Sequence, residues 1–122
     1  MTAARLHLII GTLFGAAGVA LLAAGAHSVG GQATVAGQML LFHAAAIIAA
    51  TAARKAGHLH AGIGRIAISL LILGVLLFAA DLGLRAFAGT RMFVLAAPLG
   101  GGMTIAGWLA LTLAAMVHRS QL

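Results

Sequence analysis

The feature that most constrains this chain is a long apolar run, which begins at Leu6 and continues through Gly11–Ser28 (GTLFGAAGVALLAAGAHS). The run holds about 22 residues without a charge, which is enough for a helix to cross the roughly 30 Å hydrocarbon core of a bilayer. Its glycines recur at helical spacings, at Gly11, Gly15, Gly18 and Gly25. Small residues at such spacings let membrane helices approach closely. The run therefore predicts a transmembrane helix with a helix-packing stripe.

A secretory signal is the alternative interpretation of this run, because Arg5 precedes it and Ala24-Gly25-Ala26 resembles a cleavage site. We favour a retained span, since the run exceeds the apolar core of a signal peptide and its regular glycines suit helix packing.

The composition excludes a soluble globular protein. Of the 122 residues, 63% are hydrophobic and 7% are charged, whereas soluble domains are about a quarter charged. The net charge of +6 comes from seven Lys and Arg residues beside apolar segments. They are interpreted as topology anchors that contact membrane lipids, and no nucleic acid partner is expected. Without cysteine, the chain cannot form disulfides or use a thiol nucleophile.

Four apolar segments predict the fold class, which is an all-α integral membrane four-helix bundle with up-down topology, in one domain over residues 1–122. The spans are expected at about 6–27, 36–53, 64–84 and 92–117. The second is the shortest, close to the lower limit for crossing. The connections are expected at 28–35, where Gly30-Gly31 favours a turn, at 54–65 and at 85–91.

The basic residues are divided unequally between the two ends of this bundle. The end that holds both termini has five, which are Arg5, Arg54, Lys55, Arg65 and Arg119, and the other end has two, Arg85 and Arg91. Because short loops obey the positive-inside rule, both termini are predicted to be cytoplasmic.

The scarce polar residues fall in the outer half of the predicted bundle, away from the termini. At 1.5 Å per residue, His27, His43 and Asp81 all lie within about 10 Å of the outer rim. Together with Gln38 they are the candidates for a ligand or proton site that opens outward.

Each candidate also has a structural interpretation. Asp81 can form an ion pair with Arg85 four residues later, and a structural pair that ends the third span is favoured over a proton carrier. His27 is favoured as a hydrogen-bonding group at a helix end. For His43, a neutral ring bonded to a neighbouring carbonyl and a functional role are equally supported.

A metal site is not predicted. His43 has no second histidine three or four residues away. A two-histidine, one-carboxylate set from His27, His43 and Asp81 would require three helices to bring them together. His58 and His60 are spaced too closely for one helical face and are interpreted as solvated. We therefore expect no metal and no other cofactor.

The fourth span contains Pro98 and then Gly100, Gly101 and Gly102. Proline removes an amide donor and glycine weakens a helix. One interpretation is therefore a discontinuous helix of the kind that binds substrates in transporters. The other, which we favour for so small a chain, is close helix contact at the glycines with a mild kink.

The sequence holds no catalytic constellation. The serines are few, and the single acid offers no carboxylate pair for acid–base chemistry. The glycines lie within apolar helices, unlike those of a nucleotide-binding loop. An enzyme is therefore not expected.

Four segments occur in one order along the chain: GAAGVALLAAGAH at 15–27, Phe42-His43, LLFAADL at 76–82 and APLGGGMTIAGW at 97–108. Together they resemble the small membrane proteins grouped as domain of unknown function 423, which are similar to transmembrane protein 256. The resemblance implies four transmembrane helices in a bacterial inner (plasma) membrane, or a mitochondrial setting for eukaryotic relatives, and no established activity. The family pattern has a further histidine where this chain has Ala46, and a serine- and tyrosine-bearing motif at Ala80, Asp81 and Gly83. These departures weaken the idea of a shared metal or proton site.

The leading functional hypothesis is a non-enzymatic membrane protein that acts through helix–helix contacts. It would either self-associate or serve as an accessory subunit of a larger membrane complex, and the glycine faces of the first and fourth spans motivate it. The alternative is a bundle that binds a small molecule, a proton or a metal in an outward-facing site built from His27, Gln38, His43 and Asp81.

Overall fold

The computed structural model of the chain describes residues 1–118. These residues form four long helices and one π-helical turn, and none of them lies in a strand. Helix α1 spans Ala3–Ala24 and continues into η1, Gly25–Val29; α2 spans Gly31–Lys55, α3 spans Ala61–Ala88 and α4 spans Ala96–Met116. Each helix is long and apolar enough to cross a membrane. The predicted all-α fold class with four helices is confirmed.

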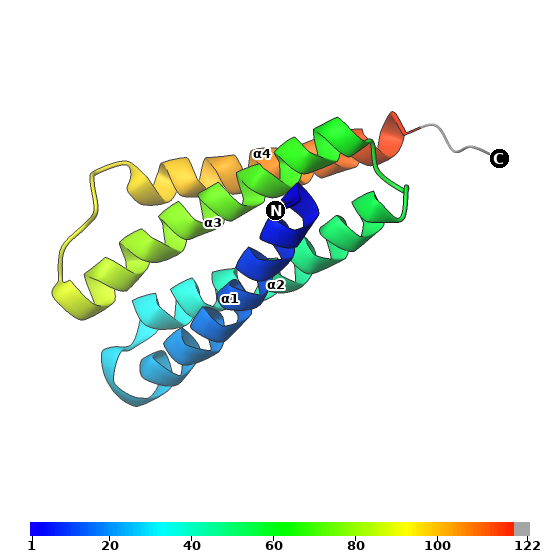
Figure 1. The fold of residues 1–122 in the computed structure, drawn as a ribbon. Coiled ribbons are helices and arrows are strands. Elements are labelled where there is room, and N and C mark those ends of the chain that lie inside the picture. Colours follow the sequence, from blue (N-terminus) through cyan, green and yellow to red (C-terminus); the bar gives the residue numbers. More distant parts are fainter. Residues whose placement is uncertain (119–122) are drawn as a thin grey trace.

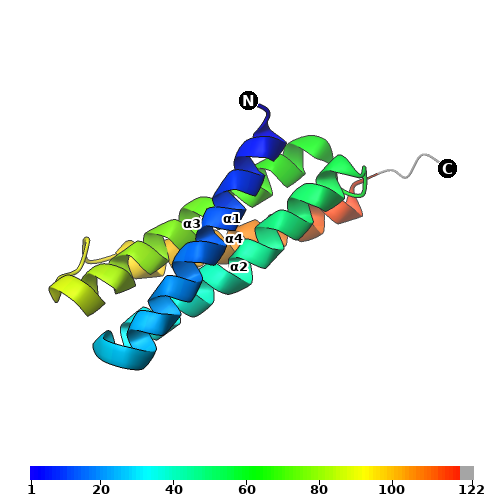
Figure 2. The same cartoon turned by 60° about the horizontal axis from the view of Figure 1, so that its bottom comes forward.

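The helices form two antiparallel hairpins that lie side by side (Figure 1). Helix α1 packs on α2, α3 packs on α4, and the hairpins meet mainly through α2 and α3. The η1 turn and the 89–95 connection lie at one end of the molecule, called here the outer end, and the 56–60 connection lies at the opposite, inner end (Figure 2).

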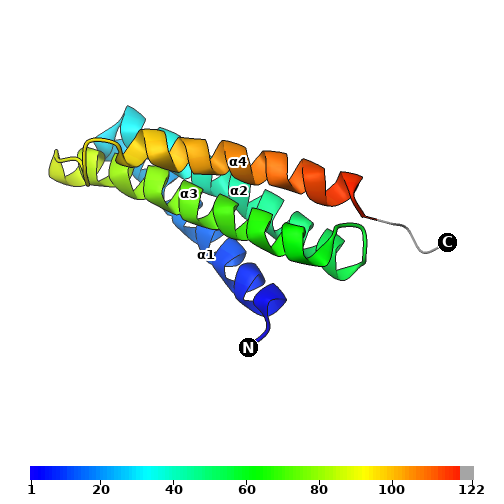
Figure 3. The same cartoon turned by 90° about the horizontal axis from the view of Figure 1, so that it is seen from above.

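Helices α1 and α4 are peripheral. Only 17% of the apolar span of α1 and 22% of that of α4 are buried, against 44% for α2 and 50% for α3. Helix α1 is also inclined to α3 and α4, so that its N-terminal end diverges from them (Figure 3). The core between α2 and α3 is aliphatic, and its largest fully buried apolar side chains are Ile47, Ile68, Leu71 and Val75.

Three helices extend beyond the predicted spans, α1 by beginning at Ala3, and the predicted connector at 28–35 is wrong. A single residue, Gly30, joins η1 to α2, with φ 75° and ψ −154°, a conformation that is essentially restricted to glycine. Helix α2 consequently has 25 residues. Helix α3 continues past residue 84 to Ala88, where the left-handed Gly89 ends it. The pair Asp81 and Arg85 therefore lies within α3 and does not end it.

The fourth helix is continuous, and the interruption considered for it is not present. It begins at Ala96 and not at residue 92, so Pro98 lies in its first turn. The amide groups of that turn have no acceptor within a helix, so a proline there removes no helical hydrogen bond. The helix then continues through Gly100, Gly101 and Gly102 to Met116.

Candidate functional site

His43 is buried in α2, and both nitrogens of its ring have hydrogen-bond partners. Nδ1 lies 2.8 Å from the carbonyl oxygen of Met39, and Nε2 lies 3.1 Å from the indole nitrogen of Trp108. Because an indole N–H can only donate, Nε2 accepts, and the ring proton on Nδ1 is donated to Met39. The two rings also meet edge to face, with 5.8 Å between their centroids. His43 therefore links α2 to α4 as a neutral ring whose polar atoms are already bonded.

Asp81 is fully buried in α3, and each of its carboxylate oxygens accepts a hydrogen bond. Arg85 donates to Oδ2, which is the ion pair expected from their spacing, and the amide of Met92 donates to Oδ1 over 2.7 Å. The second bond was not predicted, because Met92 lies beyond the end of α3. Asp81 thus fixes the 89–95 connection to the helix that precedes it.

The other two candidates, His27 in η1 and Gln38 in α2, are exposed. No described hydrogen bond joins any two of His27, Gln38, His43 and Asp81. Among residues 1–118, no three His, Cys, Asp or Glu side chains are placed to hold a metal ion. Among the described residues, no hydrogen bond or metal-ligand set therefore joins the four candidates. Equal depth along the helices does not bring side chains together when they lie on different helical faces.

The glycine stripe of α1 faces α2 of the same chain. A Cβ at Gly18 would lie 2.9 Å from the amide nitrogen of Leu41, and one at Gly37 would lie 2.8 Å from that of Leu22. Real Cβ atoms essentially never approach backbone so closely, so this helix spacing requires glycine at both positions. The other members of the stripe also point to α2: Gly11 toward Ile48, Gly15 toward Ala44 and Gly25 toward Thr34.

A second glycine contact holds α3 against α4. A Cβ at Gly74 would lie 2.7 Å from the carbonyl oxygen of Gly100, and one at Gly100 would lie 2.6 Å from the amide nitrogen of Phe78. The neighbouring Gly101 and Gly102, expected to pack against a helix with Pro98, have a different environment. A Cβ at Gly101 would meet only the Phe78 ring, 4.0 Å away, and one at Gly102 would meet nothing within 4 Å.

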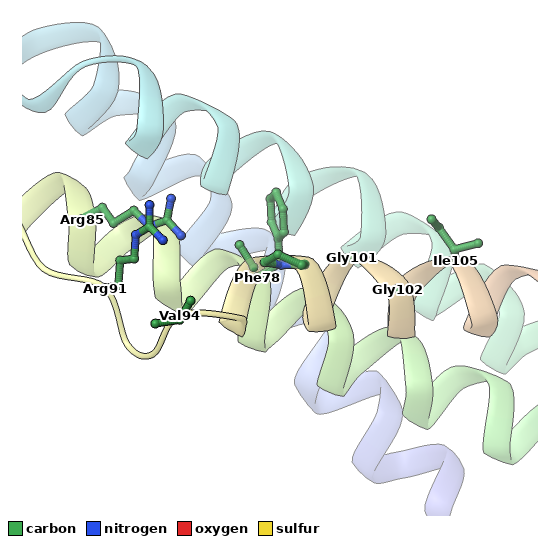
Figure 4. Close-up of a pocket in the computed structure, with 9 residues that line it drawn as sticks. Phe78, Arg85, Arg91, Val94, Gly101, Gly102 and Ile105 are labelled. Carbon is green, nitrogen blue, oxygen red and sulfur yellow. The ribbon is translucent and has the colours of Figure 1, made fainter.

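These two glycines line an open groove of about 670 Å³ beside the outer half of α4 (Figure 4). Arg85 and Arg91 stand at one end of it, and Figure 4 shows their guanidinium groups directed to the same region. The rest of the lining is apolar, and it consists of Phe78, Val94, Ala97, Pro98, Gly101, Gly102 and Ile105.

A further polar cluster, which sequence reasoning missed, lies at the inner end, where α1, α2 and α3 meet. His7 is buried, and its Nε2 is 3.3 Å from the hydroxyl oxygen of Ser69, which itself donates to the carbonyl of Arg65. Nε2 therefore donates, and Nδ1 is buried without a hydrogen-bond partner among residues 1–118. Arg54 is also buried, and its Nε has no hydrogen-bond partner in the described part of the chain. Helical spacing could have predicted the burial of His7. His7 precedes Gly11 by four residues, so both lie on the face of α1 that is buried.

Four apolar helices, close glycine contacts within each hairpin and a polar bridge between α2 and α4 define the class of multi-pass helical membrane proteins. Residues 14–101 match the family model described as Protein of unknown function (DUF423). The chain belongs to this family, as its sequence resemblance indicated. No curated protein and no solved structure matches the chain.

Proposed function

We propose that this protein is a non-enzymatic membrane subunit that acts through helix–helix contacts and self-associates through α1. The observation that carries the proposal is a lane of small, exposed residues on α1. Thr12, Ala16 and Ala20 recur every four residues and are all exposed. Small residues spaced in this way are typical of transmembrane helix interfaces.

The lane lies opposite to the face that α1 buries within its own chain. At 100° per residue, Ala16 is about 160° around the helix from both Phe14 and Gly18, which are buried. Leu13 and Val19 are exposed and flank the lane, so larger side chains stand on both sides of a shallow depression. A second copy of α1 fits such a surface, because its own flanking side chains can enter the depression.

The bonding of His43 and Asp81 supports a role through contact and not through chemistry. Both ring nitrogens of His43 and both carboxylate oxygens of Asp81 hold parts of the fold together. A proton carrier or general base needs an atom that can exchange its partner during the reaction. The same lane on α1 would also serve an accessory subunit that binds a different membrane protein.

We further propose that the protein lies in a bacterial inner membrane with both termini in the cytoplasm. The inner end carries Arg5, Arg54, Lys55 and Arg65, and the outer end carries Arg85 and Arg91. Arg119, the fifth residue counted on the inner side, lies outside the described residues. The excess of basic residues at the inner end supports this orientation through the positive-inside rule.

The test is the oligomeric state of the full chain in mild detergent, measured by native mass spectrometry over a range of protein concentrations. We expect dimers of the unmodified chain, and we expect Ala16→Ile combined with Ala20→Ile to weaken the dimer at least tenfold because the added side chains fill the lane. Ala106→Ile is the matched control, since Ala106 is exposed on α4. Monomers at all concentrations, or equal dimerisation of the double variant and the control, would contradict the proposal.

A further inference from the structure

We propose that the groove beside α4 binds one anionic phospholipid. Its phosphate would lie at Arg85 and Arg91, and the first part of an acyl chain would lie along Gly101, Gly102 and Ile105. The inference rests on the charge at one end of the groove, its depth in the membrane and the shape of its apolar walls.

The outer end of the groove carries an unbalanced positive charge. Arg85 and Arg91 both line it, and the one carboxylate nearby is Asp81, which is fully buried and already bonded to Arg85 and to the amide of Met92. Two guanidinium groups therefore face the groove against a single carboxylate that has no free oxygen. Guanidinium groups bind phosphate through paired, charge-assisted hydrogen bonds. An anion at this position would also relieve the repulsion between the two arginines.

The two arginines lie at the depth of a lipid headgroup. Helix α3 has 28 residues, and at 1.5 Å per residue it is about 42 Å long, which exceeds the roughly 30 Å of the hydrocarbon core. Arg85 is in the last turn of this helix, and Arg91 is in the connection that follows. Guanidinium groups at this level can bind the phosphate of a lipid headgroup.

The walls of the groove suit a hydrocarbon chain. From Ala97 to Ile105 the lining follows α4 for about 12 Å toward the membrane centre, and apart from the two arginines it is apolar. Gly101 and Gly102 leave room there because they lack side chains and do not approach the backbone of α3 closely. A soluble phosphate compound would contact the arginines alone, whereas a phospholipid would contact both the arginines and the apolar walls of the groove. This site is separate from the lane on α1, so either proposal can fail without the other.

The test is lipid binding by the full chain, measured by native mass spectrometry with phosphatidylglycerol and with phosphatidylethanolamine of the same acyl chains. We expect preferential binding of phosphatidylglycerol. Arg91→Gln should lower that affinity about fivefold, which corresponds to about 1 kcal/mol for one basic residue near an anionic lipid. Arg65→Gln, which removes the same charge from an exposed position at the inner end, should lower the affinity less, because Arg65 lies outside the groove.

A second pair of variants tests the groove itself. Gly102→Leu should fill it and weaken phosphatidylglycerol binding, whereas Gly83→Leu, at another glycine with open space around it, should not. The proposal is overturned if the Arg91→Gln and Arg65→Gln variants have equal affinity for phosphatidylglycerol. It is also overturned if the Gly102→Leu and Gly83→Leu variants have equal affinity for it. Equal affinity for glycerol phosphate and for phosphatidylglycerol would also overturn it, because the apolar walls would then contribute nothing.

Discussion

At the scale of single residues, two polar contacts join the hairpins: His7 meets Ser69 between α1 and α3, and Trp108 donates to His43 between α4 and α2. The indole donates to Nε2 across 3.1 Å, and the other ring nitrogen bonds within α2. Each partner satisfies a polar atom of the other in a setting with little water. Loss of either one therefore leaves a polar atom without a bond.

A double-mutant cycle measures this coupling. We expect His43→Leu and Trp108→Phe each to destabilise the chain, and the combined variant to be about 1 kcal/mol more stable than the sum of the single effects predicts. The free energy of unfolding would be measured by denaturing detergent titration in mixed micelles. Thr51→Val serves as the control partner, because Thr51 bonds only to Ile47 of its own helix. Additivity in the cycle of His43 and Trp108 would show that the bond contributes nothing.

The two polar residues differ in how far the sequence predicts their roles. The pair of Asp81 and Arg85 follows from an i, i+4 spacing on one helix. The partner of His43 lies 65 residues away, and its position depends on how α2 and α4 approach each other. His7 and Arg54 were missed because their burial depends on where α1, α2 and α3 meet, and spacing along one helix does not give that.

At the scale of the helices, glycine acts in two ways that the sequence does not distinguish. Gly18 and Gly100 lie where two backbones nearly touch, and Gly102, only two residues after Gly100, faces open space. The stripe on α1 is predictable because its members share one helical face. Three successive glycines on α4 lie about 100° apart, and which of them meets α3 depends on the rotation of the helix. Hydropathy also predicts where the four spans lie better than it predicts the residues at which the helices begin and end. The helices continue past the apolar core because their backbone hydrogen bonds do.

Alanine substitutions separate these two uses of glycine. Gly18→Ala should destabilise the chain by about 1–3 kcal/mol, because the new methyl group would overlap the backbone of α2. Gly102→Ala should be neutral or should stabilise the chain by up to about 1 kcal/mol, because alanine favours a helix and has space there. Thermal unfolding in one detergent is sufficient to compare them. Equal effects of the two substitutions would contradict the close contact between α1 and α2.

At the scale of the whole molecule, the number of helices and the family follow from composition, the apolar runs and the ordered motifs. The arrangement of the helices is less accessible to sequence reasoning. Helices α2 and α3 are central and α1 and α4 peripheral, although the peripheral α1 is more apolar than the central α2. This arrangement leaves one long face of α1 and the groove beside α4 uncovered, and both proposals depend on those surfaces lying within a membrane.

Cysteine labelling tests most directly whether the four helices cross a membrane, and it is straightforward because the chain has no cysteine of its own. With a membrane-impermeant maleimide on intact cells, Ser28→Cys and Thr90→Cys should react, and His58→Cys should react only after permeabilisation. Leu73→Cys, at a position that is 54% exposed in α3, should stay unreactive in both conditions because lipid surrounds it and suppresses ionisation of the thiol. Labelling of Leu73→Cys as fast as Thr90→Cys, or labelling of Ser28→Cys and His58→Cys from the same side, would contradict four membrane crossings.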